Sequence, residues 1–534
     1  MTVTTQAPVA VESPRNGGLG AVARGGIAGI LGAGVAGLAG LAVTWLVAHK
    51  LGPERAGAFF AATATFVLAG ALAKLGTQTG LVYWPARLRA RGQHHLLGTC
   101  LRAAFRPVVF AALAVGIAFY LGAPLLARLT ADGPGVATLT GNLRALAVFV
   151  PLMVLSDTML AATRGYRLIR PTVLLDRIAR PVLQVVGVAA VAFAAASPDA
   201  FVTAWALPYL PVVVLAGYAL HRAHSSTVAD LPRRRPKRAH RIAMRRAFWT
   251  FTGPRSIASV AQLALQRVDV LLVASLAGLG AAATYAVAGR FVVLGQFANQ
   301  GISQAVQPRL AEALAVRDRA EANRLYRTAT GWLVLLTWPL YLLVMAYAPL
   351  YLGLFGPSYR DGATVVVVLA AAMMLATGCG MVDIVLSMAG KTSWNLANVG
   401  VALGLTIGLD LALIPHLGAL GAAIGLAAAV AANNLLPLAQ VGLKLGLHPF
   451  GRGTFAAGGL ALACFGVLPR VLTDAFGGTP TATIVALATA ATAYLAGALL
   501  LRGPLELHAL TALRRNRRKR HPVTAVTAVT EGTP

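Results

Sequence analysis

A few charged side chains interrupt long apolar stretches of the sequence, and they are its first candidates for chemistry. They are Asp157, Arg267, Asp269, Arg290, Asp383 and Asp410. A charge in the hydrocarbon region costs about 2.5–3.5 kcal/mol on an insertion scale, so such residues usually face a cavity or a partner. A guanidinium presents a planar fork of donors that grips phosphate oxygens at two points. We therefore predict that Arg267 and Arg290 bind an anionic group such as pyrophosphate, with a helix-joining ion pair as the competing interpretation.

The acids in these stretches suggest a different role. We predict coupling or gating for Asp157, Asp269 and Asp383, because a buried carboxyl group can exchange a cation or a salt-bridge partner. In one continuous helix, Arg267 and Asp269 would point about 200° apart, so only one of them would face a cavity. Asp410 is expected near the outer membrane interface, where a charge costs little free energy.

Further polar side chains could assist at the ends of the same stretches. Arg177 and Arg180 are placed to meet an incoming phosphate at the cytoplasmic end, although snorkelling to lipid headgroups is the competing interpretation. Arg180 can also pair with Asp176, four residues earlier on one helix face. Amide side chains suit sugar hydroxyls, but they can equally bridge helices. The amides predicted to bind substrate are Gln266, Asn299 and Gln300, with Gln262 and Gln304 nearby.

Cofactor and enzyme chemistry find little support in the sequence. The three cysteines have unrelated spacings, and the sequence holds no metal-type cluster of His, Cys and acids and no phosphate-binding loop. We therefore expect no cofactor, no metal and no enzymatic activity. The net charge of +29 resembles that of a nucleic-acid-binding protein, but the arginines lie in loops between apolar stretches, so no nucleic-acid partner is expected.

Membrane-spanning helices must position these residues. The chain is 57% hydrophobic and only 12% charged, whereas soluble domains carry about 25% charged residues. An α-helix needs about 20 apolar residues to cross a bilayer, and about 14 such stretches recur. We therefore predict an all-α polytopic membrane protein. The predicted spans are 28–48, 56–77, 104–124, 142–162, 173–194, 201–221, 253–276, 281–304, 328–352, 364–388, 394–415, 419–442, 453–471 and 481–501.

The loops alternate between basic and nearly uncharged. Every even-numbered loop and the tail at 514–521 are basic, whereas the odd-numbered loops hold few charges. This pattern predicts that both termini are cytoplasmic. The basic loops and tail are expected to contact anionic lipids of the bilayer.

The loop at 222–248 separates two sets of six spans that share features of sequence, so we predict parallel repeats related by an axis along the membrane normal. The predicted organisation is a disordered tail (1–20), an N-terminal six-helix lobe (21–221), a basic cytoplasmic linker (222–248), a C-terminal six-helix lobe (249–443), two additional helices (444–505) and a basic disordered tail (506–534).

Four segments, taken in order, resemble the multidrug/oligosaccharidyl-lipid/polysaccharide flippase superfamily, and in particular its polysaccharide (O-antigen and exopolysaccharide) exporter branch. They are LGPERAGAFF at 51–60, KLGTQTGLVYWPARLRARG at 74–92, LFGPSYRDGA at 354–363 and the stretch 388–425. The resemblance implies two lobes around a cavity, in a bacterial inner membrane. It also implies alternating access that moves a polyprenyl-pyrophosphate-linked oligosaccharide for cell-surface polysaccharide biosynthesis. Candidate partners are a polysaccharide polymerase and glycosyltransferases.

Three alternatives stay open. A peptidoglycan lipid II flippase of this superfamily carries charges in its first span, whereas residues 28–48 hold none. A cation-coupled multidrug exporter has acids in its N-terminal lobe, for which only Asp157 and Asp176 qualify here, and it usually has 12 spans. A membrane scaffold of a glycan-assembly complex would transport nothing.

Overall fold

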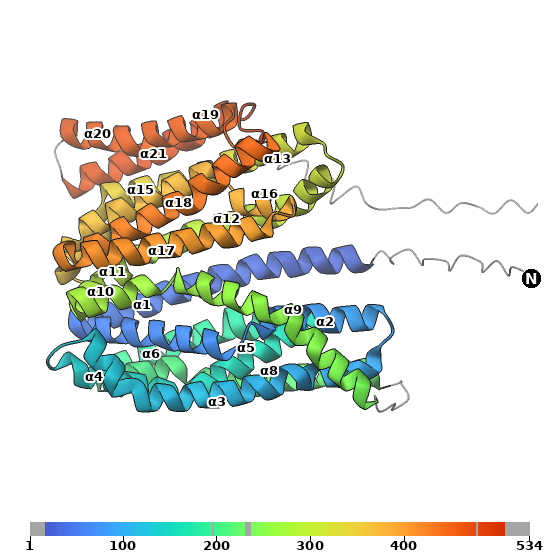
Figure 1. The fold of residues 1–534 in the computed structure, drawn as a ribbon. Coiled ribbons are helices and arrows are strands. Elements are labelled where there is room, and N and C mark those ends of the chain that lie inside the picture. The colour runs from blue at the N-terminus through green and yellow to red at the C-terminus, as the bar shows by residue number, and fades with distance from the viewer. Residues whose placement is uncertain (1–16, 195–196, 230–236, 477–478, 508–534) are drawn as a thin grey trace, which may run out of the picture. The chain divides into compact units, whose positions relative to one another are not determined.

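The computed structural model describes residues 17–194, 197–229, 237–476 and 479–507. Within these ranges every regular element is a helix (Figure 1), which confirms the predicted fold class. Most of the two predicted disordered tails, and residues 230–236 of the predicted basic linker, lie outside the described residues.

The described residues hold nine helices that are long and apolar enough to cross a membrane, or eleven if each of two bent helix pairs counts as one span. The predicted count of 14 is therefore not confirmed. One reason is that two predicted spans form a single helix, α1 (Gly17–Ala73), with a kink at Gly52. Gly52 has a φ of 72°, which favours glycine, and Pro53 follows it.

The chain divides into two compact units, each formed from several segments. Unit 1 comprises Met1–Gln304, Tyr347–Leu369 and Leu396–Asn433. Its helices, besides α1, are α2 (Thr77–Ala90), η1 (His94–Leu96), α3 (Leu97–Thr130), α4 (Gly135–Ala147), α5 (Val150–Gly165), η2 (Thr172–Ala179), α6 (Arg180–Phe193), α7 (Pro198–Ala206), α8 (Tyr209–Val228), α9 (Arg238–Ala264), α10 (Val268–Ala277), α11 (Leu279–Ala288), η3 (Gly289–Phe291), α14 (Ala348–Gly353) and η4 (Pro357–Gly362).

Unit 2 comprises Ala305–Ala346, Ala370–Asn395 and Asn434–Pro534. Its helices are α13 (Arg319–Ala346), α16 (Val382–Met388), α19 (Arg452–Ala461), η5 (Leu462–Val467), α20 (Leu468–Phe476) and α21 (Pro480–Leu500). Four helices contribute residues to both units: α12 (Val292–Ala315), α15 (Ala363–Cys379), α17 (Thr392–Leu417) and α18 (Ala419–Leu445). The predicted division into two six-helix lobes differs from these two units. The lobes and their repeat stay predictions.

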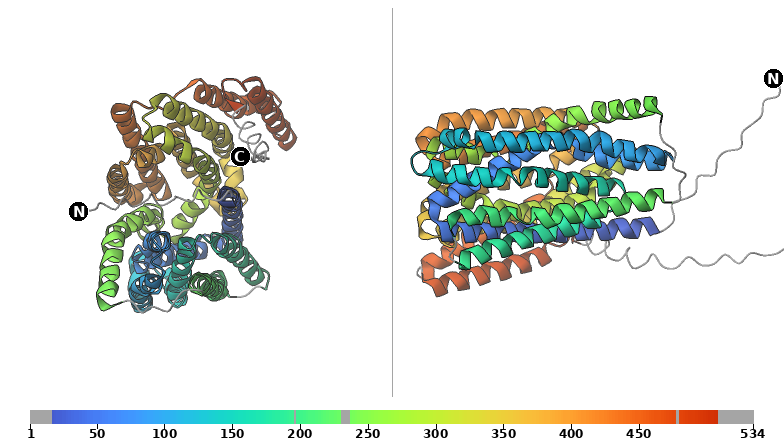
Figure 2. Two further views of the ribbon diagram at one scale, coloured as in Figure 1. Left: turned by 90° about the vertical axis from the view of Figure 1, so that its right-hand side faces the viewer. Right: turned by 90° about the horizontal axis from the view of Figure 1, so that it is seen from below.

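Small residues let the helices of unit 1 approach closely, as they do in other membrane proteins. The helix α1 packs against α11, α6 and α4. At Gly57, an added Cβ would lie 2.5 Å from the carbonyl carbon of Leu279 in α11, so glycine is required there. In unit 2, α13 packs along α19, and α20 packs along α21. The helices α20 and α21, coloured red, run side by side in Figure 2.

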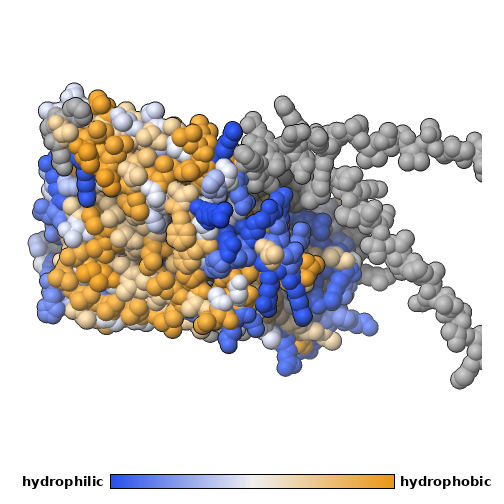
Figure 3. Space-filling view, turned by 90° about the horizontal axis from the view of Figure 1, so that it is seen from above, coloured by the Kyte–Doolittle hydropathy of each residue, from blue (hydrophilic) through white to orange (hydrophobic). Residues whose placement is uncertain are grey.

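The outer surface carries large apolar side chains, as expected for helices that face lipid. Phe110, Leu443 and Leu500 are 73%, 84% and 84% exposed. On the face drawn in Figure 3, hydrophobic residues cover a broad zone and hydrophilic residues gather mainly toward one end. This distribution agrees with a multi-pass membrane protein, in which charged loops lie beyond the hydrocarbon region.

Candidate functional site

Four charged side chains of unit 1 form a cluster inside predicted membrane spans. The Nζ atom of Lys74, just after α1, lies 2.6 Å from an oxygen of Asp157 in α5. A guanidinium nitrogen of Arg180, at the start of α6, lies 3.5 Å from Asp157 and another lies 2.7 Å from Asp176 in η2. The four side chains are between 16% and 27% exposed. Lys74 and Arg180 therefore pair with the two carboxylates, and Arg164 and Arg177 add positive charge nearby.

The cluster tests one sequence expectation. The predicted pairing of Asp176 with Arg180 on one helix face is confirmed. Arg180 also lies over the ring of Tyr209, with 5.1 Å from its guanidinium carbon to the ring centroid. Arg177 is half-buried, and an added Cβ at Gly32 of α1 would lie 3.1 Å from its Cβ. Sequence reasoning missed Lys74, because its partner Asp157 is distant along the chain.

A polar cavity of about 480 Å³ adjoins this cluster and lies within unit 1. It is lined by residues of α1, α2, α9 and the turns next to them: Ala71, Lys74, Gly76, Gln78, Thr79, Ser259, Gln262, Leu263 and Gln266. Amides, hydroxyls and one ammonium group therefore face one space. Gly76 makes the close approach of the two walls possible: its φ is 64°, and an added Cβ would lie 2.5 Å from Cα of Ser256 in α9.

The predicted span at 253–276 is broken at the candidate residue. The helix α9 ends at Ala264, α10 begins at Val268, and turn hydrogen bonds join the two. Arg267 precedes α10 with φ −136° and ψ −21°, so the expectation that Arg267 and Asp269 lie on one continuous helix is wrong. The half-buried Arg267 has no ion-pair partner among the described residues, and its Nε is buried without a hydrogen bond.

The next predicted span is bent at the second candidate arginine. Arg290 lies in the short helix η3, between α11 and α12, where the span bends by 44°. Its Nε is buried without a partner, and its guanidinium carbon lies 5.7 Å from the ring centroid of Phe60. A small cavity of about 110 Å³ joins Arg290 to Gly37 and Gly40 of α1. Within the described part of the chain, no carboxylate pairs with Arg290.

Two acids of unit 1 are buried deeply. Asp269 is 5% exposed; it accepts a 2.5 Å hydrogen bond from the hydroxyl of Tyr285 and a 2.8 Å bond from the backbone N–H of Val270. Asp410 is fully buried, and neither carboxylate oxygen has a partner among the described residues; its expected position near the outer membrane interface stays a prediction. Asp410 contacts α18 at Gly425, where an added Cβ would collide with its Oδ1.

The remaining predicted site residues lie outside the polar cavity. Asn299 and Gln300 are exposed on α12, and Asn299 accepts a hydrogen bond from Ser303. Asp383 is exposed in the first turn of α16 in unit 2, where its backbone oxygen accepts a hydrogen bond from Asn395. Of the predicted substrate-binding residues, Gln266 lines the cavity, Arg267 follows it directly, and Arg180 joins the adjacent charge cluster. No group of His, Cys, Asp and Glu that could hold a metal ion occurs among the described residues.

Comparison with known proteins adds a family match. Residues 254–411 match the MatE family model. No curated protein matches the chain by sequence.

Several solved structures share the fold. A lipid II flippase, MurJ, in an inward closed conformation is similar with a TM-score of 0.69 and 13% identity, over 88% of this chain and 98% of that one. An inward-facing multidrug resistance MATE family transporter of the MOP superfamily has a TM-score of 0.60 and 16% identity, over 77% of this chain and 95% of that one. A MOP superfamily transporter from Pyrococcus furiosus has a TM-score of 0.54 and 17% identity, over 80% and 95% of the two chains.

At these identities the solved structures show the fold: that of a multi-pass membrane transporter. Residues 254–411 are thus similar to the MatE family, and the chain has the fold of the MurJ and MATE membrane transporters. These similarities do not confirm the polysaccharide exporter branch that the sequence suggested.

Proposed function

We propose that this membrane transporter of the MatE/MOP type is a flippase that moves polyprenyl-pyrophosphate-linked oligosaccharide across the bacterial inner membrane by alternating access. One observation carries the proposal: at two breaks in membrane helices, Arg267 and Arg290 form no ion pair with a carboxylate among the described residues, and each has a buried Nε without a hydrogen-bond partner. Broken helices in transporters commonly line substrate sites. An unpaired guanidinium in such a place is a receptor for an anion, and a pyrophosphate offers oxygens for both.

The polar cavity supports a glycan next to that anion. Gln262, Gln266 and Ser259 offer amide and hydroxyl groups that can exchange hydrogen bonds with sugar hydroxyls. A volume of about 480 Å³ accommodates sugar rings, since small-molecule sites occupy about 300–1,000 Å³. We retain Asn299 and Gln300 in the proposal as residues that contact the substrate in another conformation of the transporter.

The charge cluster is suited to gating. Lys74 both lines the cavity and pairs with Asp157. An incoming phosphate would compete with Asp157 for the same ammonium group and loosen the contact between the end of α1 and α5. Arg177 and Arg180 would meet the phosphate at the cytoplasmic end of the path. We assign Asp157 to gating on this basis, and we retain Asp269 and Asp383 as further coupling or gating candidates.

The proposed orientation in the membrane follows from the charges of the loops. We place both termini, the basic linker and the basic tail on the cytoplasmic side, where anionic lipids attract them. A polysaccharide polymerase and glycosyltransferases are the proposed functional partners.

A second candidate function is peptidoglycan lipid II flipping. The observation that favours it is the likeness to MurJ, whose TM-score of 0.69 exceeds the 0.60 of the multidrug transporter. The absence of charge from residues 28–48 argues against it, as does the resemblance to polysaccharide exporters. A third candidate function is that of a cation-coupled multidrug exporter, which the MatE family match at residues 254–411 favours.

The test uses a strain that lacks the protein. The lipids of this strain are extracted and identified by mass spectrometry. We expect a lipid-linked oligosaccharide to accumulate while surface polysaccharide is lost. Accumulation of lipid II would favour the second candidate, and increased drug susceptibility without lipid accumulation would favour the third. Intact surface glycan with no accumulating lipid would overturn the proposal.

Complementation then tests the site residues. Arg267→Gln and Arg290→Gln should fail to restore export, because each removes a proposed phosphate ligand. Arg128→Gln is the matched control, since Arg128 is exposed in the last turn of α3 and lies outside the cavity. A membrane scaffold would tolerate all three changes, so full complementation by the first two would contradict a transport role.

A further inference from the structure

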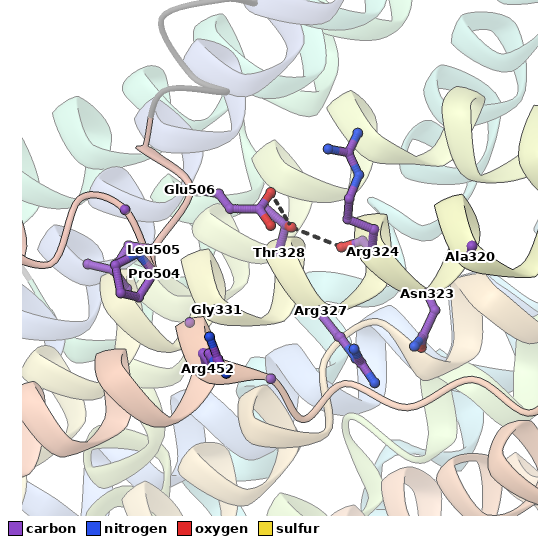
Figure 4. A pocket seen from close by; sticks show the side chains of 13 residues that line it. Ala320, Asn323, Arg324, Arg327, Thr328, Gly331, Arg452, Pro504, Leu505 and Glu506 are labelled. Atoms are coloured by element: carbon purple, nitrogen blue, oxygen red, sulfur yellow. Dashed lines mark hydrogen bonds between the residues drawn. The ribbon is translucent and has the colours of Figure 1, made fainter.

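A second cavity lies entirely within unit 2. Its volume is about 620 Å³, and it is enclosed by the first turns of α13, the start of α19 and the turn that follows α21 (Figure 4). The lining residues are Ala320, Asn323, Arg324, Arg327, Thr328, Gly331, Gly451, Arg452, Gly453, Gly503, Pro504, Leu505 and Glu506. This cavity shares no residue with the polar cavity of unit 1.

Three arginines contribute to its wall. Arg324 is held by Glu321 through hydrogen bonds of 2.9 and 3.1 Å. Arg327 hydrogen-bonds to His448, but its Nε is buried without a partner. Arg452 is exposed and has no partner among the described residues. Positive charge is therefore only partly compensated inside this cavity.

The lining carries one carboxylate, Glu506, and it is already engaged. The hydroxyl of Thr328 lies 2.9 Å from Glu506 Oε2, as the dashed line in Figure 4 shows. This hydrogen bond ties the turn after α21 to α13. Glu506 acts electrostatically on Arg324, and among the described residues it forms no ion pair with Arg327 or Arg452.

The start of α19 adds donors to the same wall. Gly451 precedes the helix with an extended backbone and provides no side-chain cap, so the first N–H groups of α19 lack an acceptor within the helix. Arg452 lies in this first turn, where the helix dipole disfavours a cation. An added Cβ at Gly453 would lie 2.7 Å from the carbonyl oxygen of Pro504, so glycine allows the turn to close over the helix end. An anion in the cavity would satisfy both the helix end and the guanidiniums.

We propose that this cavity binds a phosphate group, supplied either by an anionic lipid headgroup or by a soluble phosphate. Arg327 and Arg452 donate to its oxygens together with the N–H groups that begin α19. Phosphate fits because guanidinium forks and helix N-termini are both suited to tetrahedral oxyanions. The site is independent of the proposed transport substrate, because none of its residues lies in unit 1.

The test measures binding to the purified full chain. Inorganic phosphate is titrated into the protein held in phosphatidylcholine nanodiscs, and binding is followed by calorimetry. In parallel, nanodiscs with phosphatidylglycerol are used, and native mass spectrometry counts the lipids that stay bound. Arg452→Gln tests the site, since its exposed side chain can be changed without disturbing the fold; Arg327→Gln is the second variant. Arg502→Gln is the matched control, because Arg502 is exposed on the same turn but does not line the cavity.

Each result has a defined meaning. A dissociation constant for phosphate that rises about tenfold or more in Arg452→Gln and Arg327→Gln, but not in Arg502→Gln, supports a soluble phosphate as the ligand. Retention of phosphatidylglycerol by the original chain and by Arg502→Gln, with loss in the two site variants, supports a lipid headgroup. If neither probe binds, or if all variants bind alike, the proposal is overturned. Because export is not measured, failure here leaves the flippase proposal untouched, and failure of that proposal leaves this one standing.

Discussion

Neutralising Asp157 should lower the free energy of unfolding, and the structure sets limits on how large this loss can be. Breaking a fully buried ion pair by removing one partner costs about 3–5 kcal/mol. Lys74 lies 2.6 Å from Asp157 and is 17% exposed, but it also lines a polar cavity where water can solvate it. Arg180 retains Asp176 as a partner. For Asp157→Asn we therefore expect a loss of about 2 kcal/mol in the free energy of unfolding, in the range of a single charge-assisted hydrogen bond.

A double-mutant cycle measures the pair itself. Lys74→Met keeps the aliphatic stem and removes the ammonium group, so the combination with Asp157→Asn removes both charges of the pair and leaves Arg180 paired with Asp176. We expect the double variant to be more stable than the sum of the single losses predicts, with a coupling energy of about 2 kcal/mol. The assay is reversible unfolding in detergent micelles, followed by tryptophan fluorescence. Glu321→Gln is the control, because it breaks an exposed ion pair that is worth about 0–1 kcal/mol. Strictly additive losses would refute the claim that Lys74 and Asp157 stabilise each other.

Three further changes test the packing in unit 1 through the unfolding temperature in micelles. Gly76→Ala and Gly92→Ala both place a side chain at positive φ (64° and 67°), but only the side chain at position 76 collides with the backbone of α9. Gly76→Ala should therefore lower the free energy of unfolding by about 1–3 kcal/mol more than Gly92→Ala. Equal losses would contradict the close approach of Gly76 to α9. Gly57→Ala should destabilise α1 against α11, whereas Gly34→Ala, with open space around it, should not; equal stability of these two variants would argue against that contact. Tyr285→Phe removes the 2.5 Å hydrogen bond that the buried carboxylate of Asp269 accepts. This change should lower the free energy of unfolding by about 1–3 kcal/mol. Unchanged stability would show that the hydrogen bond does not stabilise the fold.

Some features of the fold and site were predictable because local sequence determines them. Apolar length predicted the helices, and the spacing of Asp176 and Arg180 predicted their ion pair. The kink in α1 has a local signal in Gly52 followed by Pro53. In each case the residue that sets the backbone geometry can be read directly from the chain.

Other features depend on contacts that the sequence does not encode locally. The break before Arg267 has no glycine or proline to mark it, so periodicity predicted a continuous helix. The partner of Lys74 lies far along the chain, and nothing near Lys74 identifies it. The burial of Asp410 against Gly425 of α18 likewise has no local signal in the sequence. Tertiary packing decides all three.

The central claim is that Arg267 and Arg290 hold the pyrophosphate of a lipid-linked glycan. The most direct measurement is the affinity of the purified protein for a polyprenyl-pyrophosphate-linked oligosaccharide, determined by native mass spectrometry for the original chain, Arg267→Gln, Arg290→Gln and Arg128→Gln. We predict binding that weakens about tenfold or more in each of the first two variants and is unchanged in the third. Equal affinity in all four proteins, or equal binding of the same glycan on a lipid without phosphate, would contradict the account.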